Sequence, residues 1–174
     1  MPFLSQVAVR RLGLGCWQLT EPLAYRDDDG PVPGRVFTAP AGYRTDWATI
    51  PRWATVLVPH LGLWDEPAVI HDLGCDALRE RRQQLRAGHL EPRVPWLDAR
   101  GVDALWHRCL LDVGVGPVMA LLLWVAVRWG ALASPWRRVG WWRDAPAVLT
   151  VAALVFAVTV VLALGADRLV HALV

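Results

Sequence analysis

The sequence predicts an α+β fold, with a small N-terminal β-hairpin or sheet packed on a helical bundle, plus one C-terminal transmembrane helix. Three observations predict it. Two β-type segments flank a cluster of turn-forming residues, apolar residues recur at helical spacing further along, and the composition changes in the last third. Of the 16 acidic residues, only Asp144 and Asp167 follow Val113. The 174 residues suffice for one compact domain and an appendage.

The β part is expected in residues 15–26 and 35–46. Residues 27–31, three aspartates followed by glycine and proline, separate the two segments. Such turn formers are typical of a hairpin connection. A Pro-Ala-Gly sequence at 40–42 should bend the second strand, and residues 46–52 should form a loop that contains Pro51.

Two helices are expected in the domain. The first begins at Asp65, an N-cap residue type, and Glu66 in its first turn favours the positive helix end. Residues 81–100 are polar and contain two prolines, so they should form an exposed excursion. The second helix should then run from Val102 until glycine and proline at 114–117 end it. Its apolar stripe has amphipathic spacing and comprises Val102, Leu105, Trp106, Cys109 and Leu110.

Residues 145–165 form the predicted membrane span. These 21 residues carry no charge, and about 20 apolar residues cross a hydrocarbon core of about 30 Å. We divide the chain into a domain at 1–133, a juxtamembrane linker at 134–144, the span at 145–165 and a tail at 166–174. The linker holds tryptophans and basic residues suited to lipid headgroups: Trp136, Arg137, Arg138, Trp141, Trp142 and Arg143. The positive-inside rule predicts a single-pass protein of the bacterial inner (cytoplasmic) membrane with a cytoplasmic domain.

A second apolar stretch leaves an alternative open. Residues 115–127 are almost wholly apolar, but Arg128 interrupts the run. About 13 residues suit a buried or interfacial helix better than a span. A hairpin of two spans would also place the basic linker outside, against the charge rule. One span is the preferred interpretation.

Composition and charge exclude some function classes. All 18 basic residues are arginine, the net charge is +2, and acidic and basic residues are interspersed, so no nucleic-acid partner is expected. The three cysteines, Cys16, Cys75 and Cys109, form no C-x-x-C pair and predict reduced thiols. The N-terminus shows no signal peptide.

The residues most suggestive of chemistry are one histidine and several aspartates. His71-Asp72 lies on the first helix, Asp103 lies beside the apolar stripe of the second, and His107 follows one turn later. If the two helices pack together, imidazole and carboxylate meet at a half-buried seam that Asp46 could join. Divalent metals use this mixture of nitrogen and anionic oxygen. We therefore predict a Zn, Mn or Mg site with Asp46, His71, Asp72, Asp103 and His107 as ligands.

A structural alternative stays open for the same residues. A buried His–Asp hydrogen bond could pin the two helices, because buried charges persist only when paired. His71 and Cys75, at i and i+4, make half of a zinc site, but no second pair stands at ligand spacing. Phosphate-loop, Gly-x-Ser-x-Gly and His-Glu-x-x-His motifs are absent.

Four sequence blocks resemble a known family, the domain of unknown function numbered 1353, common in tailed phages and prophages. Residues 38–52 (TAPAGYRTDWATIPR) resemble its pattern V-P-A-G-F-x-T-D-x-A-S-V-P-R. Residues 68–72 (AVIHD) resemble A-V-x-H-D-Y-L-Y, 102–106 (VDALW) resemble A-D-x-x-F, and 126–130 (AVRWG) resemble A-V-R-x-x-G. The similarity covers roughly residues 15–133.

The resemblance implies which polar positions are shared and where Arg128 belongs. Asp46, His71, Asp72 and Asp103 are the shared polar positions, and Arg128 belongs to the domain instead of a membrane span. Thr49 replaces the usual serine, Leu73-Gly74 departs from Tyr-Leu-Tyr, and the membrane helix is an addition. The family brings no established reaction.

The leading functional hypothesis is a membrane-tethered, phage-related domain with an Asp/His divalent-metal site. Asp46, His71, Asp72 and Asp103 would then be catalytic in a metal-dependent hydrolase, since a bound ion lowers the pKa of its water. The alternative is a non-enzymatic part of a phage or phage-like assembly, injection or lysis system, with the bilayer and a homo-oligomer or assembly as partners. A small pore former is a third possibility, disfavoured by the single span.

Overall fold

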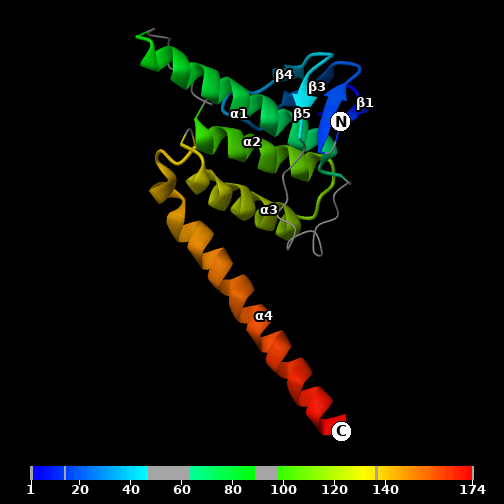
Figure 1. Cartoon of the computed structure of the whole chain (residues 1–174), viewed down its shortest axis with the longest axis vertical. Coiled ribbons are helices and arrows are strands. Elements are labelled where there is room, and N and C mark those ends of the chain that lie inside the picture. The colour runs from blue at the N-terminus through cyan, green and yellow to red at the C-terminus, as the bar shows by residue number, and fades with distance from the viewer. Residues whose placement is uncertain (1, 14, 47–62, 89–97, 136, 174) are drawn as a thin grey trace.

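A computed structural model describes residues 2–13, 15–46, 63–88, 98–135 and 137–173, except for the side chains of 162–173. Three helices stack beside two small sheets, and a fourth helix extends away from them (Figure 1). The strands are β1 (Val9–Gly13), β2 (Cys16–Leu19), β3 (Leu23–Asp27), β4 (Arg35–Ala39) and β5 (Arg44–Thr45). The helices are α1 (Asp65–Arg86), α2 (Ala99–Asp112), α3 (Pro117–Gly130) and α4 (Ala145–Leu173), with short 3₁₀ turns η2 (Ala131–Ala133) and η3 (Trp141–Arg143). The α+β class is confirmed.

Each predicted strand is divided into two shorter strands, so the predicted boundaries were wrong. The first segment breaks between Leu19 and Leu23, where Pro22 lacks an N–H for the ladder. The second breaks at the predicted Pro-Ala-Gly bend, where Gly42 has a φ of +86°. The breaks let the chain change sheets: β1, β2 and β5 form one antiparallel sheet, and β3 pairs with β4 in another. Strand β1 was not predicted, because its exposed VRRLG sequence lacks alternation.

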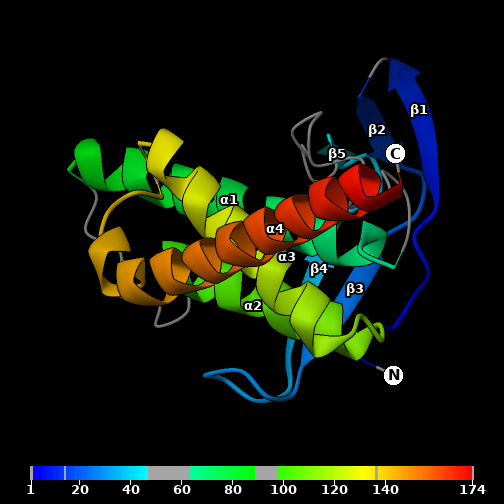
Figure 2. The ribbon, with the colours of Figure 1, turned by 90° about the horizontal axis from the view of Figure 1, so that it is seen from below.

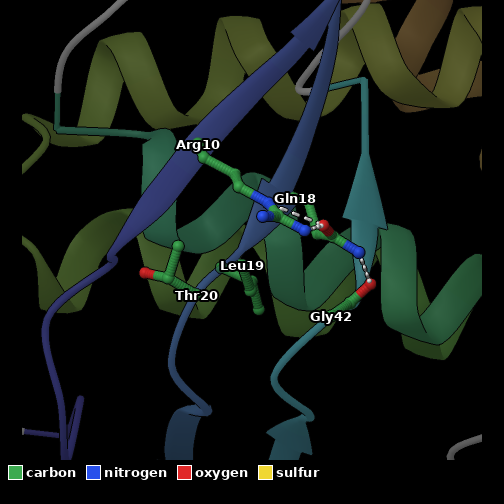
Figure 3. Close-up of a pocket in the computed structure, with 5 residues that line it drawn as sticks. All are labelled: Arg10, Gln18, Leu19, Thr20 and Gly42. Carbon is green, nitrogen blue, oxygen red and sulfur yellow. Dashed lines mark hydrogen bonds between the residues drawn. The ribbon is translucent and has the colours of Figure 1, made fainter.

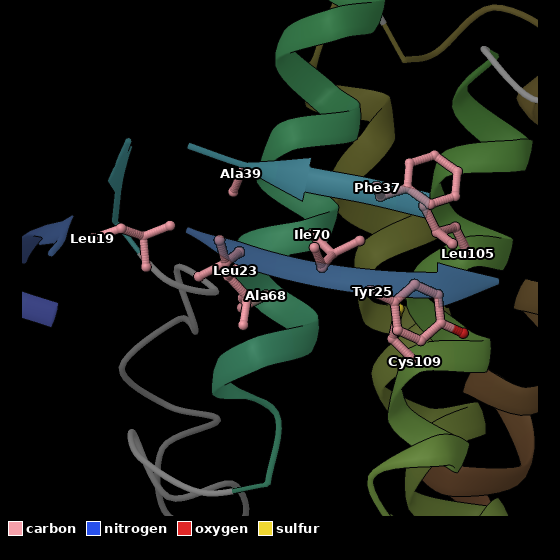
Figure 4. Packing of buried hydrophobic residues seen from close by; sticks show 10 residues of the cluster. Leu19, Leu23, Tyr25, Phe37, Ala39, Ala68, Ile70, Leu105 and Cys109 are labelled. Atoms are coloured by element: carbon pink, nitrogen blue, oxygen red, sulfur yellow. The ribbon is translucent and has the colours of Figure 1, made fainter. Parts of the chain in front are cut away.

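The predicted hairpin connects β3 and β4. Leu23 pairs with Ala39, and the register continues to Asp27 opposite Arg35. The inner face of this hairpin packs on the N-terminal part of α1 and on α2 (Figure 4). The main core comprises Leu19, Leu23, Tyr25, Phe37, Ala39, Ala68, Val69, Ile70, Leu105 and Cys109.

Helix α1 begins at Asp65 as expected, but the N-cap is Trp64, with no side-chain capping bond. Asp65 is therefore the first helical residue, where its charge still faces the positive helix end. Helix α1 continues to Arg86, so the start of the predicted excursion is helical. Pro92 and Pro95 lie outside the described residues, as do residues 47–52 of the predicted loop.

Helices α1 and α2 approach closely at Gly74. A Cβ at this position would lie 2.9 Å from Cγ1 of Val102 on α2. The absence of a side chain therefore allows this crossing, which brings His71 and Asp103 into the same interface.

Helix α3 packs on α2 through a second apolar cluster of Trp106, Leu110, Val115, Ala120 and Leu123. Its 14 residues span about 21 Å at 1.5 Å per residue, short of the roughly 30 Å hydrocarbon core. Arg128 is only 1% exposed inside the domain. The structure thus places α3 with the domain, as a helix with one buried face.

Among the described side chains of α4, those buried against the domain lie near the beginning of the helix. Val148 is fully buried, whereas residues 153–161 are exposed. Seen from below, α4 lies in front of α3 (Figure 2), because it extends away from the domain on that side (Figure 1). Within the described part of the chain, no helix meets both the length and the apolarity needed to cross a membrane. The span predicted at 145–165 includes residues 162–165, whose side chains are not described.

Candidate functional site: a buried ion-pair network and an acidic pocket

The structure brings His71 and Asp103 together at the α1–α2 interface. Nε2 of His71 lies 2.9 Å from Oδ1 of Asp103, and the imidazole ring also lies 5.3 Å from the ring of Trp106. Asp103 is completely buried, and 12% of the His71 side chain is exposed. The helical spacing of the sequence therefore located a real contact.

Two arginines complete the surroundings of Asp103. Arg128 Nη1 donates to Oδ2 at 2.8 Å, and Arg137 Nη2 donates to Oδ1 at 2.5 Å. Burial alone would raise the pKa of Asp103, but the hydrogen bond from His71 and the charge of Arg137 lower it by more. Asp103 is therefore a carboxylate, and both of its oxygens accept N–H groups.

The contacts continue from Asp103 to the start of α4. Arg128 Nη2 lies 2.9 Å from Oδ2 of Asp144, and Arg100 Nε lies 3.0 Å from Oδ1 of the same residue. Asp144 is 3% exposed, and its carbonyl accepts the N–H of Val148 in the first turn of α4. We call His71, Asp103, Arg128, Arg137 and Asp144 the buried ion-pair network.

The network holds His71 in its charged form. Burial lowers the pKa of His71, but its interactions with Cys75 and Asp103 outweigh burial and raise the pKa to about 10. The Cys75 sulfur lies 3.7 Å from Nε2 and 4.0 Å from Nδ1 of His71. With Asp103 ionised, Nε2 acts as the donor toward its carboxylate.

A separate pocket holds the other predicted carboxylates. It has a volume of about 310 Å³ and lies between β5 and α1. Thr45 donates to Asp72 at 2.5 Å, and Tyr43 donates to Asp76 at 2.9 Å. We call this the acidic pocket, lined by Cys16, Tyr43, Arg44, Thr45, Asp46, Asp72, Cys75, Asp76 and Arg79.

Asp72 is the most perturbed carboxyl group in the acidic pocket. Burial raises its pKa from 3.8 to about 6, and the negative charges of Asp46 and Asp76 act in the same direction. The Thr45 hydrogen bond and the charge of His71 oppose this effect. A site that disfavours the ionised form in this way would gain from an added positive charge.

The five predicted ligands do not line one cavity. Asp46 and Asp72 line the acidic pocket, whereas His71 and Asp103 belong to the ion-pair network. His107 lies on α2, and burial followed by the charge of Arg108 lowers its pKa. Among the described residues, no group of three or more His, Cys, Asp or Glu side chains is placed to hold a metal ion. The full five-ligand set does not fit an ion, because both oxygens of Asp103 already accept N–H groups.

Another pocket, of about 280 Å³, lies along the β1–β2–β5 sheet (Figure 3). Arg10 donates to Gln18 Oε1 through Nε at 2.9 Å and Nη2 at 2.6 Å. Gln18 Nε2 in turn donates to the Gly42 carbonyl at 2.9 Å. Arg10 and Gln18 thus direct these polar groups toward each other and the backbone, so this pocket is a weaker candidate than the acidic pocket.

Sequence reasoning missed several members of both sites. Arg137 and Asp144 were interpreted only as juxtamembrane residues, and Asp76 was not singled out. Asp144 carried a usable signal, because an isolated acid within an apolar third of the chain needs a partner if it is buried. No pattern in the sequence indicated that Arg137 would pair with Asp103.

Most of the chain matches a known protein family. This family, described as "Protein of unknown function (DUF1353)", matches residues 17–127, more than half of the chain. The chain belongs to the DUF1353 family. No curated protein and no solved structure matches it.

The segment that matches DUF1353 contains only part of the ion-pair network. The matched segment contains His71 and Asp103, together with the acidic-pocket residues Asp46 and Asp72. Arg128, Arg137 and Asp144 follow the matched segment. The network therefore connects the family domain to the region that precedes α4.

Proposed function

We propose that this DUF1353 protein is a non-enzymatic, membrane-anchored domain. Helix α4 inserts into the bilayer, and the buried ion-pair network fixes the domain to this anchor. The process that it serves is phage-derived, such as particle assembly, injection or lysis, as the resemblance of the four sequence blocks implies. The domain faces the cytoplasm, because the basic linker precedes the apolar segment.

The contact between Arg128 and Asp144 is the observation that carries this proposal. Asp144 stands at the N-terminus of α4 and is 3% exposed, and Arg128 on α3 is 1% exposed. Arg128 also binds Asp103, so paired charges reach from the α1–α2 interface to α4. Buried charges that each pair with more than one partner restrict the movement of the joined helices relative to one another. This arrangement favours a positioning role for His71 and Asp103 over metal binding.

The apolar surface of α4 supports the anchor. The helix carries no charge over 145–165, and its described portion beyond Ala153 is exposed. Exposed apolar area of this length is costly in water and favourable in lipid. Its exposed large side chains are Leu149, Leu154, Val155, Phe156, Val158, Val160 and Val161.

Membrane extraction tests the anchor. We expect the full-length protein to stay with bacterial membranes in alkaline carbonate, and the Leu154→Arg/Val158→Arg variant to be released, because arginine near a helix centre costs about 2.5–3.5 kcal/mol. Leu85→Arg, at an exposed position on α1, is the matched control and should not be released. Release of the unmodified chain by carbonate would contradict the anchor.

Thermal unfolding of His71→Ala tests the positioning role. Removing His71 should lower Tm, because Asp103 loses a hydrogen bond in a fully buried position. The decrease should be the same with EDTA and with added Zn²⁺, Mn²⁺ or Mg²⁺, as measured by scanning calorimetry in detergent. A metal-dependent Tm that is lost in His71→Ala would instead support the ligand set predicted from the sequence.

A divalent cation in the acidic pocket is the second candidate. It is favoured by the raised pKa of Asp72, which results first from burial and then from the nearby negative charges of Asp46 and Asp76. Hard cations such as Mg²⁺ are held by one or two carboxylates and water, and Asp46 and Asp72 would supply these carboxylates. In the same calorimetry, this candidate predicts a Tm increase with Mg²⁺ or Mn²⁺ that persists in His71→Ala and disappears in Asp46→Asn and Asp72→Asn.

A further inference from the structure

Helix α3 exposes an apolar face that the domain does not cover. Val118 is 72% exposed, Leu121 is 41% exposed and Trp129 is 50% exposed. Val118 and Trp129 are eleven residues apart, about three helical turns, and Leu121 is one turn from Val118, so all three share a face. The opposite side of α3 packs on α2.

This face contains no charged residue. The only charge among the 14 residues of α3 is Arg128, which is buried and paired with Asp103 and Asp144. A surface helix in water normally carries polar or charged residues on its outer face. The outer face of α3 therefore lacks the composition of a surface that contacts water.

The position of this face points to one occupant, the lipid bilayer. Helix α3 lies at the side of the domain from which α4 extends (Figure 1). Helix α4, with its exposed apolar side chains, therefore leaves the domain on the side that α3 occupies. A bilayer that receives α4 would also come within reach of α3.

The junction between α3 and α4 has the side chains of a membrane interface. Trp142 is 72% exposed, and the guanidinium carbon of Arg143 lies 5.6 Å from its ring centroid. Arg138 is also exposed, and Trp129 contacts Trp141 edge to face. Exposed tryptophans suit the headgroup layer, and exposed arginines attract anionic lipids.

We propose that α3 is an interfacial helix, with the face formed by Val118, Leu121 and Trp129 resting in the headgroup and acyl boundary of the bilayer. This inference rests on the proposed function, because α4 brings the domain to the membrane. It adds an orientation: the domain lies against the bilayer on α3, and the β-sheets and acidic pocket remain accessible from the aqueous side.

Site-directed spin labelling of the full chain tests this orientation. The background carries Cys16→Ser and Cys75→Ser, while Cys109 is fully buried. Single labels are placed through Val118→Cys and Leu121→Cys, with Leu85→Cys on α1 and Val36→Cys on β4 as exposed controls. The protein is reconstituted in vesicles of phosphatidylethanolamine and phosphatidylglycerol, and collision rates are measured with oxygen and with a water-soluble nickel chelate.

We expect labels at positions 118 and 121 to collide more with oxygen than with the nickel chelate, and labels at positions 85 and 36 to do the reverse.

A label at Phe156→Cys reports separately on whether α4 is in the membrane. If the 118 and 121 labels behave like the controls while the 156 label is in lipid, docking of α3 is overturned and the anchor survives. If the 156 label is also in water, the proposed function fails. Protection of 118 and 121 from both reagents would indicate a protein contact and overturn lipid docking. Unchanged urea midpoints verify that each variant folds.

Discussion

At the scale of single residues, the environment of Asp103 differs from that of Asp72. Asp103 is fully buried, yet its pKa is lowered, because His71, Arg128 and Arg137 all donate to it. Burial and the neighbouring carboxylates raise the pKa of Asp72 by more than its hydrogen bond from Thr45 lowers it. One carboxylate is stabilised as an ion, and the other is not.

The raised pKa of Asp72 predicts a pH-dependent effect of Asp72→Asn. Between pH 3.8 and about 6 the unfolded chain ionises this group before the folded protein does, so stability falls as pH rises and stays lower above that window. Asparagine removes the ionisation and keeps an oxygen acceptor for Thr45. We expect Asp72→Asn to stabilise the protein by about 1–3 kcal/mol above this window and by little below it.

Urea unfolding across the same pH range measures this effect. Asp28→Asn is a suitable control, because Asp28 forms an exposed ion pair with Arg26, with the two side chains 53% and 47% exposed. A stability gain for Asp72→Asn that does not change with pH would show that charge is not its cause.

At the scale of elements, the close approach of α1 and α2 positions the His71–Asp103 contact. Two independent contacts also hold the β part of the domain to these helices. Arg108 on α2 donates to both carboxylate oxygens of Asp27, at 2.8 and 2.7 Å, and Tyr43 donates to Asp76 on α1. The crossing of the helices itself depends on a small residue, Gly74.

Gly74→Ala is expected to destabilise the protein, although alanine favours helix formation over glycine by about 1 kcal/mol. Its Cβ would lie 2.9 Å from Val102, a β-branched residue with restricted rotamers, so the helices must separate. Overpacking of this kind costs about 1–3 kcal/mol. Gly130→Ala is the matched control, because a Cβ there would meet nothing within 4 Å beyond its chain neighbours and the nearby backbone of its own helix. Chemical denaturation should show a loss for Gly74→Ala and none for Gly130→Ala; equal effects would remove the steric explanation.

At the scale of the whole molecule, the ion-pair network joins elements that are far apart in sequence. It begins on α1 at His71, passes through α2 and α3, and ends at Asp144 before α4. A network built this way holds the domain at a defined angle to the beginning of α4, because every link is buried or half-buried.

Hydrogen exchange of Asp144→Asn in detergent tests this coupling. The substitution removes the anion between Arg128 and Arg100. Amides of residues 145–149 should then exchange faster, because the first turn of α4 loses its link to the domain, while those of β3 and β4 should change little. Faster exchange across the whole domain would indicate global destabilisation instead of a local link.

The sequence alone predicted the local features of this protein. The α+β class, the hairpin at 27–31, the start of α1 and the amphipathic stripe of α2 all follow from short-range patterns. The His71–Asp103 contact followed as well, since both residues border the apolar stripes of helices that had to pack together. Periodicity reports which face of an element is buried, and so it can suggest which side chains meet.

Only the tertiary structure decided which charged residues belong to the ion-pair network and which to the acidic pocket. The sequence grouped five polar residues into one site, whereas the fold places Asp103 against Arg128 and Arg137 and places Asp46 and Asp72 in a different pocket. It also split each predicted strand between two sheets. The physical reason is that ion pairing depends on the distance and burial of groups remote in sequence, such as Asp103 and Arg137, and no local pattern encodes those quantities.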